Sequence, residues 1–487
     1  MSTSRRWALA GARVMTGLIG IAAALSTVAA AVLLPWPSQS VQPVETVVTP
    51  AAAEQQRVCP GPLLTLAADA SAASAASSIG SANTVYAAGS VNALSPDAVA
   101  VSPLQIPDNV AGEAAGTPLV LSVPAQEDAA SDAPLLAGAQ SQTAQTETLT
   151  GFAAARCAEA GSDGWLVAGS TSTGQTSLIL LSNPTAVVAS VDLTVYGENG
   201  LVDAPGATGI LVQPGSQRVV ALAGLAPNLN SPVVHVATRG GQVVASLQQS
   251  VIRGLVPGGI DLVGTTAAPD LEQVIAGFIV PAALIDPTRS NESGIHDDGA
   301  VVRVLSLGDV PADVTLSVTA DADGGNGSST TVTLEPGVAS EIPLGDLTAG
   351  SYTVRLNSDA PLVAAARSTE KSAASEDFAW FAASGTLGDH SAIAVADGPA
   401  PTLRLANPST MAQTVTLQQP GAAPVTLSLP AGSALIRPLD AGASYTLEGE
   451  SLDGVRASVS YQGSAALASF TISPPGPLAQ PIGVYVR

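Results

Sequence analysis

The sequence predicts an all-β protein, built of tandem β-sandwich modules behind a single N-terminal transmembrane helix. Three observations support this prediction. After Trp165, apolar and polar residues alternate, and turn residues recur roughly every 8–12 positions. The 47 Gly and 36 Pro are spread along the chain, which disfavours long helices. One segment near the N-terminus is uncharged over a length sufficient to cross a membrane.

The charge balance excludes one class of function. The 487 residues include 39 Asp and Glu against 17 Lys and Arg, a net charge of −22. A nucleic-acid partner is therefore not expected, because no excess of basic residues exists to replace the counterions of a phosphate backbone. With only three His and two Cys, the chain is also poor in metal ligands, and we expect neither a metal nor a cofactor.

The N-terminus predicts the compartment. Arg5, Arg6 and Arg13 precede the 21 uncharged residues Val14–Leu34, which can cross a hydrocarbon core of ~30 Å as a helix. The early positive charge keeps the first residues cytoplasmic, so we expect a single-pass plasma-membrane protein with its bulk outside the cytoplasm. A cleavable signal peptide ending near Ala29–Ala31 is the alternative, although its apolar core would normally span only ~7–15 residues.

The two cysteines predict one disulfide. Cys59 and Cys157 are the only cysteines of a chain expected to be exported, where thiols oxidise. Closing the loop between them restricts the unfolded chain by about 4–5 kcal/mol in the loop-entropy model. A redox pair is the alternative, but it would need sulfurs close in sequence or on a thioredoxin-like unit, and neither pattern is present.

Composition and turn spacing divide the chain into seven segments. They are 1–36, cytoplasmic tip and transmembrane anchor or signal; 37–58, linker; 59–164, an Ala/Ser-rich N-terminal β layer tied by the disulfide; 165–265, first β-sandwich; 266–299, linker; 300–395, second β-sandwich; and 396–487, third β-sandwich.

The three sandwiches contain related blocks at about 177–256, 300–372 and 401–473. In the first and third blocks the opening strand ends in Asn-Pro, at Asn183 and Asn407. The second and third blocks share a late tyrosine, Tyr352 and Tyr445, with an alanine twelve residues further on. Blocks of about 75–80 residues with six or seven short strands have the size of an Ig-like sandwich.

Six short motifs carry a family resemblance. They are Val58-Cys59-Pro60-Gly61-Pro62, Ala155-Arg156-Cys157, Gly164–Gly169, Leu181-Ser182-Asn183-Pro184, Gly240–Ala245 and Gly254–Asp261. Together with the N-terminal span they resemble an actinobacterial family of membrane-anchored secreted proteins, often labelled "large secreted protein", whose domain is of unknown function. Leu166 and Leu262 stand where that family favours aromatic residues. The resemblance implies no catalytic residues.

Candidate binding residues are few. In Phe378-Ala379-Trp380 the alternation places both rings on one side of a strand, either as buried packing or as an aromatic contact patch for a ligand. The acidic segment 321–327 is a hairpin turn or a weak Ca²⁺ loop, although Gly325 and Val332 stand where an EF-hand needs ligands. Ile295-His296-Asp297-Asp298 is interpreted as part of a linker.

These features predict a non-enzymatic, membrane-anchored extracytoplasmic protein of the cell envelope. We expect it to be a scaffold or a binding protein for another envelope protein or polysaccharide. Two alternatives remain: an envelope glycan-active enzyme, which needs two carboxyl groups ~5–10 Å apart in a cleft, and an array of carbohydrate-binding modules, which needs exposed Trp or Tyr faces. No catalytic residue is predicted.

Overall fold

The structure is a computed structural model of the chain. It describes residues 45–48, 54–66, 76–90, 93–111, 116–124, 134–282, 299–322, 326–345, 347–372, 375–450, 452–473 and 482–485. In these ranges the chain forms β-strands and three short 3₁₀ turns, so the all-β prediction is confirmed. The turns are η2 (Pro96–Ala98), η4 (Leu222–Gly224) and η5 (Leu452–Gly454).

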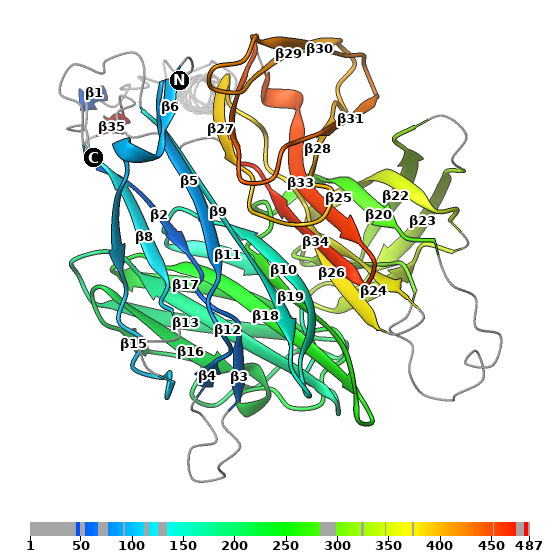
Figure 1. The fold of residues 1–487 in the computed structure, drawn as a ribbon. Coiled ribbons are helices and arrows are strands. Elements are labelled where there is room, and N and C mark those ends of the chain that lie inside the picture. Colours follow the sequence, from blue (N-terminus) through cyan, green and yellow to red (C-terminus); the bar gives the residue numbers. More distant parts are fainter. Residues whose placement is uncertain are drawn as a thin grey trace, which may run out of the picture. The chain divides into compact units, whose positions relative to one another are not determined.

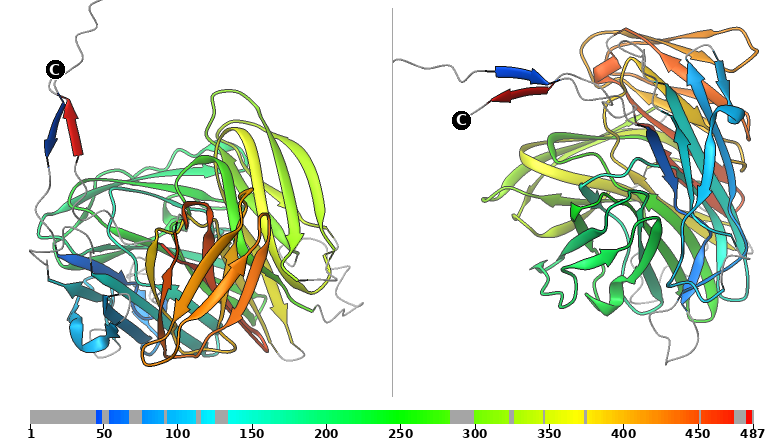
Figure 2. Two further views of the ribbon diagram at one scale, coloured as in Figure 1. Left: turned by 90° about the horizontal axis from the view of Figure 1, so that it is seen from above. Right: turned by 90° about the vertical axis from the view of Figure 1, so that its left-hand side faces the viewer.

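The predicted transmembrane segment, 14–34, lies outside the described residues. In the part of the chain that is described, no helix has the length and apolar character needed to cross a membrane. The chain divides into two compact units, Met1–Pro50 with Gln480–Arg487, and Ala51–Ala479. In the first unit, β1 (Glu45–Val48) and β35 (Ile482–Tyr485) pair antiparallel, as Figure 2 shows.

The second unit contains a β-sandwich over residues 163–264 (Figure 1). One sheet has the order β16-β12-β18-β19; the other has β11-β17-β13, with β14 and β15 both paired to β13. Along β13, buried residues alternate with half-buried ones, as expected for a strand with one face on a core. The strands are β11 (Asp163–Leu166), β12 (Gln175–Asn183), β13 (Ala189–Gly197), β14 (Gly200–Leu201), β15 (Ile210–Val212), β16 (Ser216–Ala221), β17 (Val233–Gly240), β18 (Val244–Arg253) and β19 (Val256–Gly264).

The next sandwich shares one long strand between its two layers. Strand β25 pairs with β22 and most of β20 in its first half, and with β21 and β26 in its second half. Strands β23 and β24 pair with β22 and β21. Strand β20 lies inside 266–299, which we expected to be a linker. The strands are β20 (Asp270–Val280), β21 (Val301–Ser306), β22 (Ala312–Ala320), β23 (Ser328–Leu334), β24 (Ala339–Pro343), β25 (Gly350–Lys371) and β26 (Glu376–Ala382).

The last sandwich has the same strand order as the first. Its sheets are β27-β32-β29-β30 and β31-β28-β33-β34, which correspond strand by strand to β11-β17-β13-β15 and β16-β12-β18-β19. Its core is made of aliphatic residues with Tyr445 and Tyr461. The strands are β27 (His390–Ala394), β28 (Thr402–Ala406), β29 (Gln413–Gln418), β30 (Val425–Leu429), β31 (Ala434–Pro438), β32 (Ser444–Glu448), β33 (Arg456–Gly463) and β34 (Ala466–Thr471).

The N-terminal part of this unit is also built of sheets, with orders β10-β9-β5-β6, β2-β8-β7 and β3-β4. The predicted disulfide is confirmed: Cys59 at the end of β2 bonds to Cys157, directly after β10. The strands are β2 (Gln55–Cys59), β3 (Leu64–Leu66), β4 (Ala76–Ser78), β5 (Asn83–Ser90), β6 (Ala93–Ser95), β7 (Ala100–Pro103), β8 (Leu119–Val123), β9 (Leu135–Gln145) and β10 (Thr150–Arg156).

Strand β10 is buried on both faces. Phe152 and Ala154 pack into the core of the last sandwich, whereas Ala153 and Ala155 pack against the outer face of β12, on Leu178 and Leu180. Small side chains on alternate positions allow both neighbours to approach the strand closely. The N-terminal sheet is therefore held between two sandwiches.

Four edge strands meet in the middle of this unit. Strands β10, β19, β26 and β34 are each an edge strand of a different sheet. Each packs against two of the others, in the cyclic order β10, β19, β26, β34 and back to β10. Figure 1 shows their labels gathered where the cyan, green, yellow and red parts of the ribbon come together. We call this arrangement the four-strand junction.

Candidate functional site

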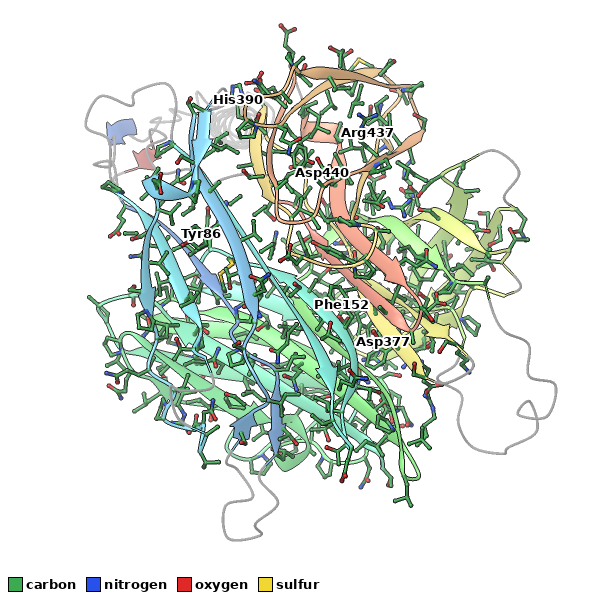
Figure 3. All side chains as sticks on the ribbon, in the orientation of Figure 1. Tyr86, Phe152, Asp377, His390, Arg437 and Asp440 are labelled. Atoms are coloured by element: carbon green, nitrogen blue, oxygen red, sulfur yellow. A yellow bond between two sulfur atoms is a disulfide. The ribbon has the colours of Figure 1, made fainter. Side chains whose placement is uncertain are left out.

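A buried carboxylate occupies the four-strand junction. Asp377 of β26 has no exposed surface. Its Oδ2 accepts hydrogen bonds from the backbone N–H of Phe152 in β10, at 2.8 Å, and of Leu467 in β34, at 3.1 Å. Its Oδ1 accepts from the N–H of Ile260 in β19, also at 3.1 Å. One side chain thus accepts one backbone N–H from each of the three other strands. Figure 3 labels Asp377 and Phe152 at this junction.

Two glycines leave the space that this carboxylate fills. A Cβ atom at Gly151 would lie 2.4 Å from Oδ1 of Asp377, and one at Gly259 would lie 2.8 Å from the same atom. Both glycines have positive φ, +136° and +110°, which other residues rarely adopt. The junction therefore requires glycine at both positions, in the strands that donate to Asp377.

Burial raises the pKa of Asp377 well above its ordinary value, although the three amide hydrogen bonds oppose this effect. A second buried carboxylate, Asp261 of β19, accepts hydrogen bonds from the N–H of Trp380 at 2.7 Å and of Leu262 at 2.8 Å. Burial raises the pKa of Asp261 to about 7. Neither group reaches solvent, so both act as structural acceptors for backbone amides and not as acids in a cleft.

An open cavity of ≈ 750 Å³ lies beside the junction. Gly151 and Phe152 of β10 line it, as does Glu376, the neighbour of Asp377. The rest of its wall comes from residues 79–83, β9, Thr150, Ser375, the segment 397–399 and the turn between β33 and β34. Most of its polar side chains are hydroxyl and amide groups: Ser81, Asn83, Ser141, Gln142, Thr143, Gln145, Thr150, Ser375 and Ser464.

Both carboxylates of this cavity have polar partners. The side-chain amide of Asn83 donates to Oδ2 of Asp397, and Ser141 Oγ donates to the Asp397 backbone carbonyl at 2.5 Å. Glu376 forms an ion pair with Arg253. These contacts hold the segment that begins at Asp397 against β5 and β9, so the wall is built from two different parts of the fold.

Unusual backbone geometry gathers at the same cavity. Three non-glycine residues of the described chain have positive φ: Asn228, Ala400 and Ala465. Ala465, at +49°, lines the cavity in the β33–β34 turn, and Ala400, at +42°, follows the lining residue Pro399. A positive φ costs an alanine on the order of 1 kcal/mol, and such strain concentrates at binding sites.

The predicted aromatic contact patch is not at the surface, which corrects that interpretation. Trp380 is fully buried and Phe378 is 3% exposed, both within the core of the first sandwich. The indole N–H of Trp380 donates to Gln249 at 2.7 Å, and the guanidinium of buried Arg303 lies 4.4 Å from its ring centroid. The rings therefore join two sandwiches, which is the buried-packing alternative.

Arg303 completes that contact. Its guanidinium donates to the carbonyls of Gly169, Pro232 and Asn230 and to the carboxylate of Glu341, at 2.7–3.1 Å. Burial lowers the pKa of Arg303 to about 10, so it remains charged at neutral pH. A buried arginine with these acceptors fixes the first sandwich to the second.

The other candidate residues from the sequence analysis do not come together in one site. Asp321 accepts hydrogen bonds from Ser351 and Thr353, and residues 323–325 of its segment lie outside the described residues. His296 also lies outside them. His235 Nε2 lies 2.6 Å from Oδ2 of Asp163. Within the described ranges, no three His, Cys, Asp or Glu side chains gather in a way that could hold a metal ion.

The comparison with known families finds a domain of unknown function. Residues 109–435, about two thirds of the chain, match the family described as "Family of unknown function (DUF5719)". The chain belongs to this family. The region matched to DUF5719 contains Phe152, Ile260 and Asp377 but ends before β34. No curated protein and no solved structure matches the chain.

Sequence reasoning did not identify Asp377, Asn83 or Asp397. Two signals were available, the Gly-Gly pair before Ile260 and the isolated Gly151 within an Ala-rich strand, since glycine in a strand marks close approach of another group. The sequence does not show which carboxylate approaches, because that residue is 226 positions from one glycine and 118 from the other.

Proposed function

We propose that the chain is a non-enzymatic, membrane-anchored extracytoplasmic protein of the cell envelope that binds and positions another envelope component. The observation that supports this proposal is the cavity beside the four-strand junction, which is large, is lined by many hydroxyl and amide side chains and is built on joined β layers. Its two carboxylates, Asp397 and Glu376, are paired with Asn83 and Arg253. Groups held in this way suit recognition better than proton transfer.

Two further features support the location. The uncharged stretch 14–34 follows three arginines, and this arrangement favours a single span with the N-terminus in the cytoplasm. The Cys59–Cys157 disulfide fits an oxidising compartment. The proposal therefore has the anchor in the plasma membrane and residues 51–479 outside the cytoplasm.

Within this proposal the sandwiches are Ig-like modules. The hydroxyl of Tyr352 donates to the Thr348 carbonyl at 2.7 Å, and the hydroxyl of Tyr445 accepts from the Asp440 N–H at 2.9 Å. A tyrosine that bonds back to the backbone a few residues upstream is typical of Greek-key sandwiches. The matching strand orders of the first and last sandwich are consistent with one repeated module.

Crosslinking in intact cells tests this function. A photoreactive residue placed at Gln145, which is exposed at the cavity, should crosslink the full-length chain to an envelope protein or glycan. The same residue at Ser428, exposed on β30 and outside the cavity, is the control and should not give that adduct. Identical adducts from both positions, or none from either, would contradict the proposal.

A further inference from the structure

We infer that the cavity beside the four-strand junction binds a segment of an uncharged, hydroxyl-rich polysaccharide. The inference rests on the proposed binding function and names its ligand class. The cavity volume, ≈ 750 Å³, falls in the range of ~300–1,000 Å³ typical of ligand sites.

The lining disfavours anionic ligands and offers hydroxyl and amide side chains. Among the residues that line the cavity in the described structure, there are two acids and no Lys or Arg. An anionic glycan or a phosphorylated ligand would find no cation there and would meet the field of a chain with net charge −22. Hydroxyl and amide side chains each both donate and accept, which matches the same capacity in sugar hydroxyls.

An extended peptide is disfavoured by the junction itself. A peptide that adds to a sheet needs unpaired backbone groups at an edge strand. Three edge strands border the cavity, β10, β26 and β34. The N–H groups of Phe152 in β10 and Leu467 in β34 already donate to Asp377 of β26. The cavity therefore offers side chains for recognition and no open backbone ladder at these two positions.

The floor of the cavity is closely packed. Gly398 lies against the ring of Phe152, which is 4% exposed: a Cβ at Gly398 would lie 2.5 Å from Cζ of this ring. Phe152 in turn packs on Tyr461, with ring centroids 5.4 Å apart. The strained residues Ala400 and Ala465 lie in the two loops that contribute Pro399 and Ser464 to the cavity wall, and such strain is retained where a site must keep its shape.

Calorimetric titration of the purified full-length chain tests the inference. The probes are four soluble uncharged polysaccharides (a glucan, a mannan, a galactan and a xylan), with anionic polygalacturonate and a Ser/Thr/Gln-rich peptide for comparison. At least one uncharged polymer should bind. Ser464→Trp, which places a bulky ring in the cavity, should weaken that binding about tenfold or more, and Gln145→Ala should weaken it less.

Thr410→Trp is the matched control, because Thr410 is an exposed loop residue of the same sandwich and lies outside the cavity. It should bind like the unmodified chain, and both Trp variants should show its melting temperature. The inference is overturned if no uncharged polymer binds, if only polygalacturonate or the peptide binds, or if Ser464→Trp binds as well as Thr410→Trp. If the polymers fail while the Gln145 crosslink in cells persists, the glycan class is wrong and the binding function stands.

Discussion

The carboxylate of Asp377 accepts a hydrogen bond from the backbone N–H of Phe152, 2.8 Å away in space and 225 residues earlier in the chain. The same side chain accepts from Ile260 and Leu467. Such a contact would not exist in a row of independent sandwiches, because each would satisfy its own edge strands. In this unit the last strand of each sandwich and of the N-terminal layers is therefore part of a shared interior.

Asp377→Ala should destabilise the chain strongly. The substitution leaves three buried N–H groups without an acceptor, and each costs about 1–3 kcal/mol. We expect a loss of at least about 3 kcal/mol in the free energy of unfolding, measured by urea titration. Asp377→Asn keeps one acceptor oxygen and should lose less. Equal stability of Asp377→Ala and the unmodified chain would refute the role of this carboxylate.

Stability should fall as the pH rises from about 4 to about 7. The pKa of Asp261 is raised to about 7 in the folded chain from an ordinary 3.8, so folding favours its protonated form. This contribution is complete below pH 3.8 and is lost as the pH passes 7, a change on the order of 4 kcal/mol. The raised pKa of Asp377 acts in the same direction.

Urea titrations across this pH range, on the unmodified chain and on Asp261→Asn, isolate the effect, since ion pairs elsewhere titrate alike in both. The variant should show a flatter profile. Asp203→Asn, at an exposed position, controls for the change in net charge. Parallel profiles for Asp261→Asn and the unmodified chain would show that Asp261 is ionised equally in the folded and unfolded states.

The disulfide should stabilise the fold mainly because it restricts the conformations of the unfolded chain. Cys59 and Cys157 are separated by 98 residues, and the loop-entropy model gives about 4–5 kcal/mol for such a loop. A Cys59→Ser/Cys157→Ser double variant should lower the denaturant midpoint accordingly. Both sulfurs are buried, so dithiothreitol should reduce the bond only slowly unless denaturant is present. Rapid reduction of the native chain would contradict this expectation.

Arg303 should contribute far more to the free energy of unfolding than a surface arginine does. Arg303→Met leaves the carbonyls of Gly169, Pro232 and Asn230 without this donor and removes the cation from the Trp380 ring. We expect the free energy of unfolding to fall by at least about 3 kcal/mol, as measured by Trp fluorescence during urea unfolding. Arg239→Met is the control, since the Arg239 side chain is 82% exposed and its pair with Asp192 should contribute about 0–1 kcal/mol.

Local sequence patterns predicted the features that are determined by residues close together in the chain. Asn183 and Asn407, matched by the Asn-Pro repeat, make the same bonds: each side-chain amide donates to the carbonyl four residues on, Val187 or Met411. Each side-chain oxygen accepts from the N–H two residues on. This repeated polar turn explains why the motif recurs where β12 and β28 end. Alternation likewise identified β13 and β22 as strands with one buried face.

The junction could not be predicted from such patterns. Strand β12 is buried on both faces because β10, an Ala-rich strand from the N-terminal part, covers it. Strand β20 was missed because its partner residues in β25 lie 70 or more residues further along the chain. The alternation of Phe378 and Trp380 is compatible with a surface patch as well as with buried packing. In each case the burial depends on a distant segment, which a local window does not contain.

Hydrogen exchange of Asp377→Ala tests the four-strand junction most directly. Under native conditions the account predicts faster exchange at the amides of Phe152, Ile260 and Leu467 together, although they lie in three separate parts of the chain. The amides of Leu193 and Val415, in the middle of β13 and β29, should keep the protection they have in the unmodified chain. Unchanged protection at the three junction amides, or a uniform increase in exchange along the chain, would contradict the account.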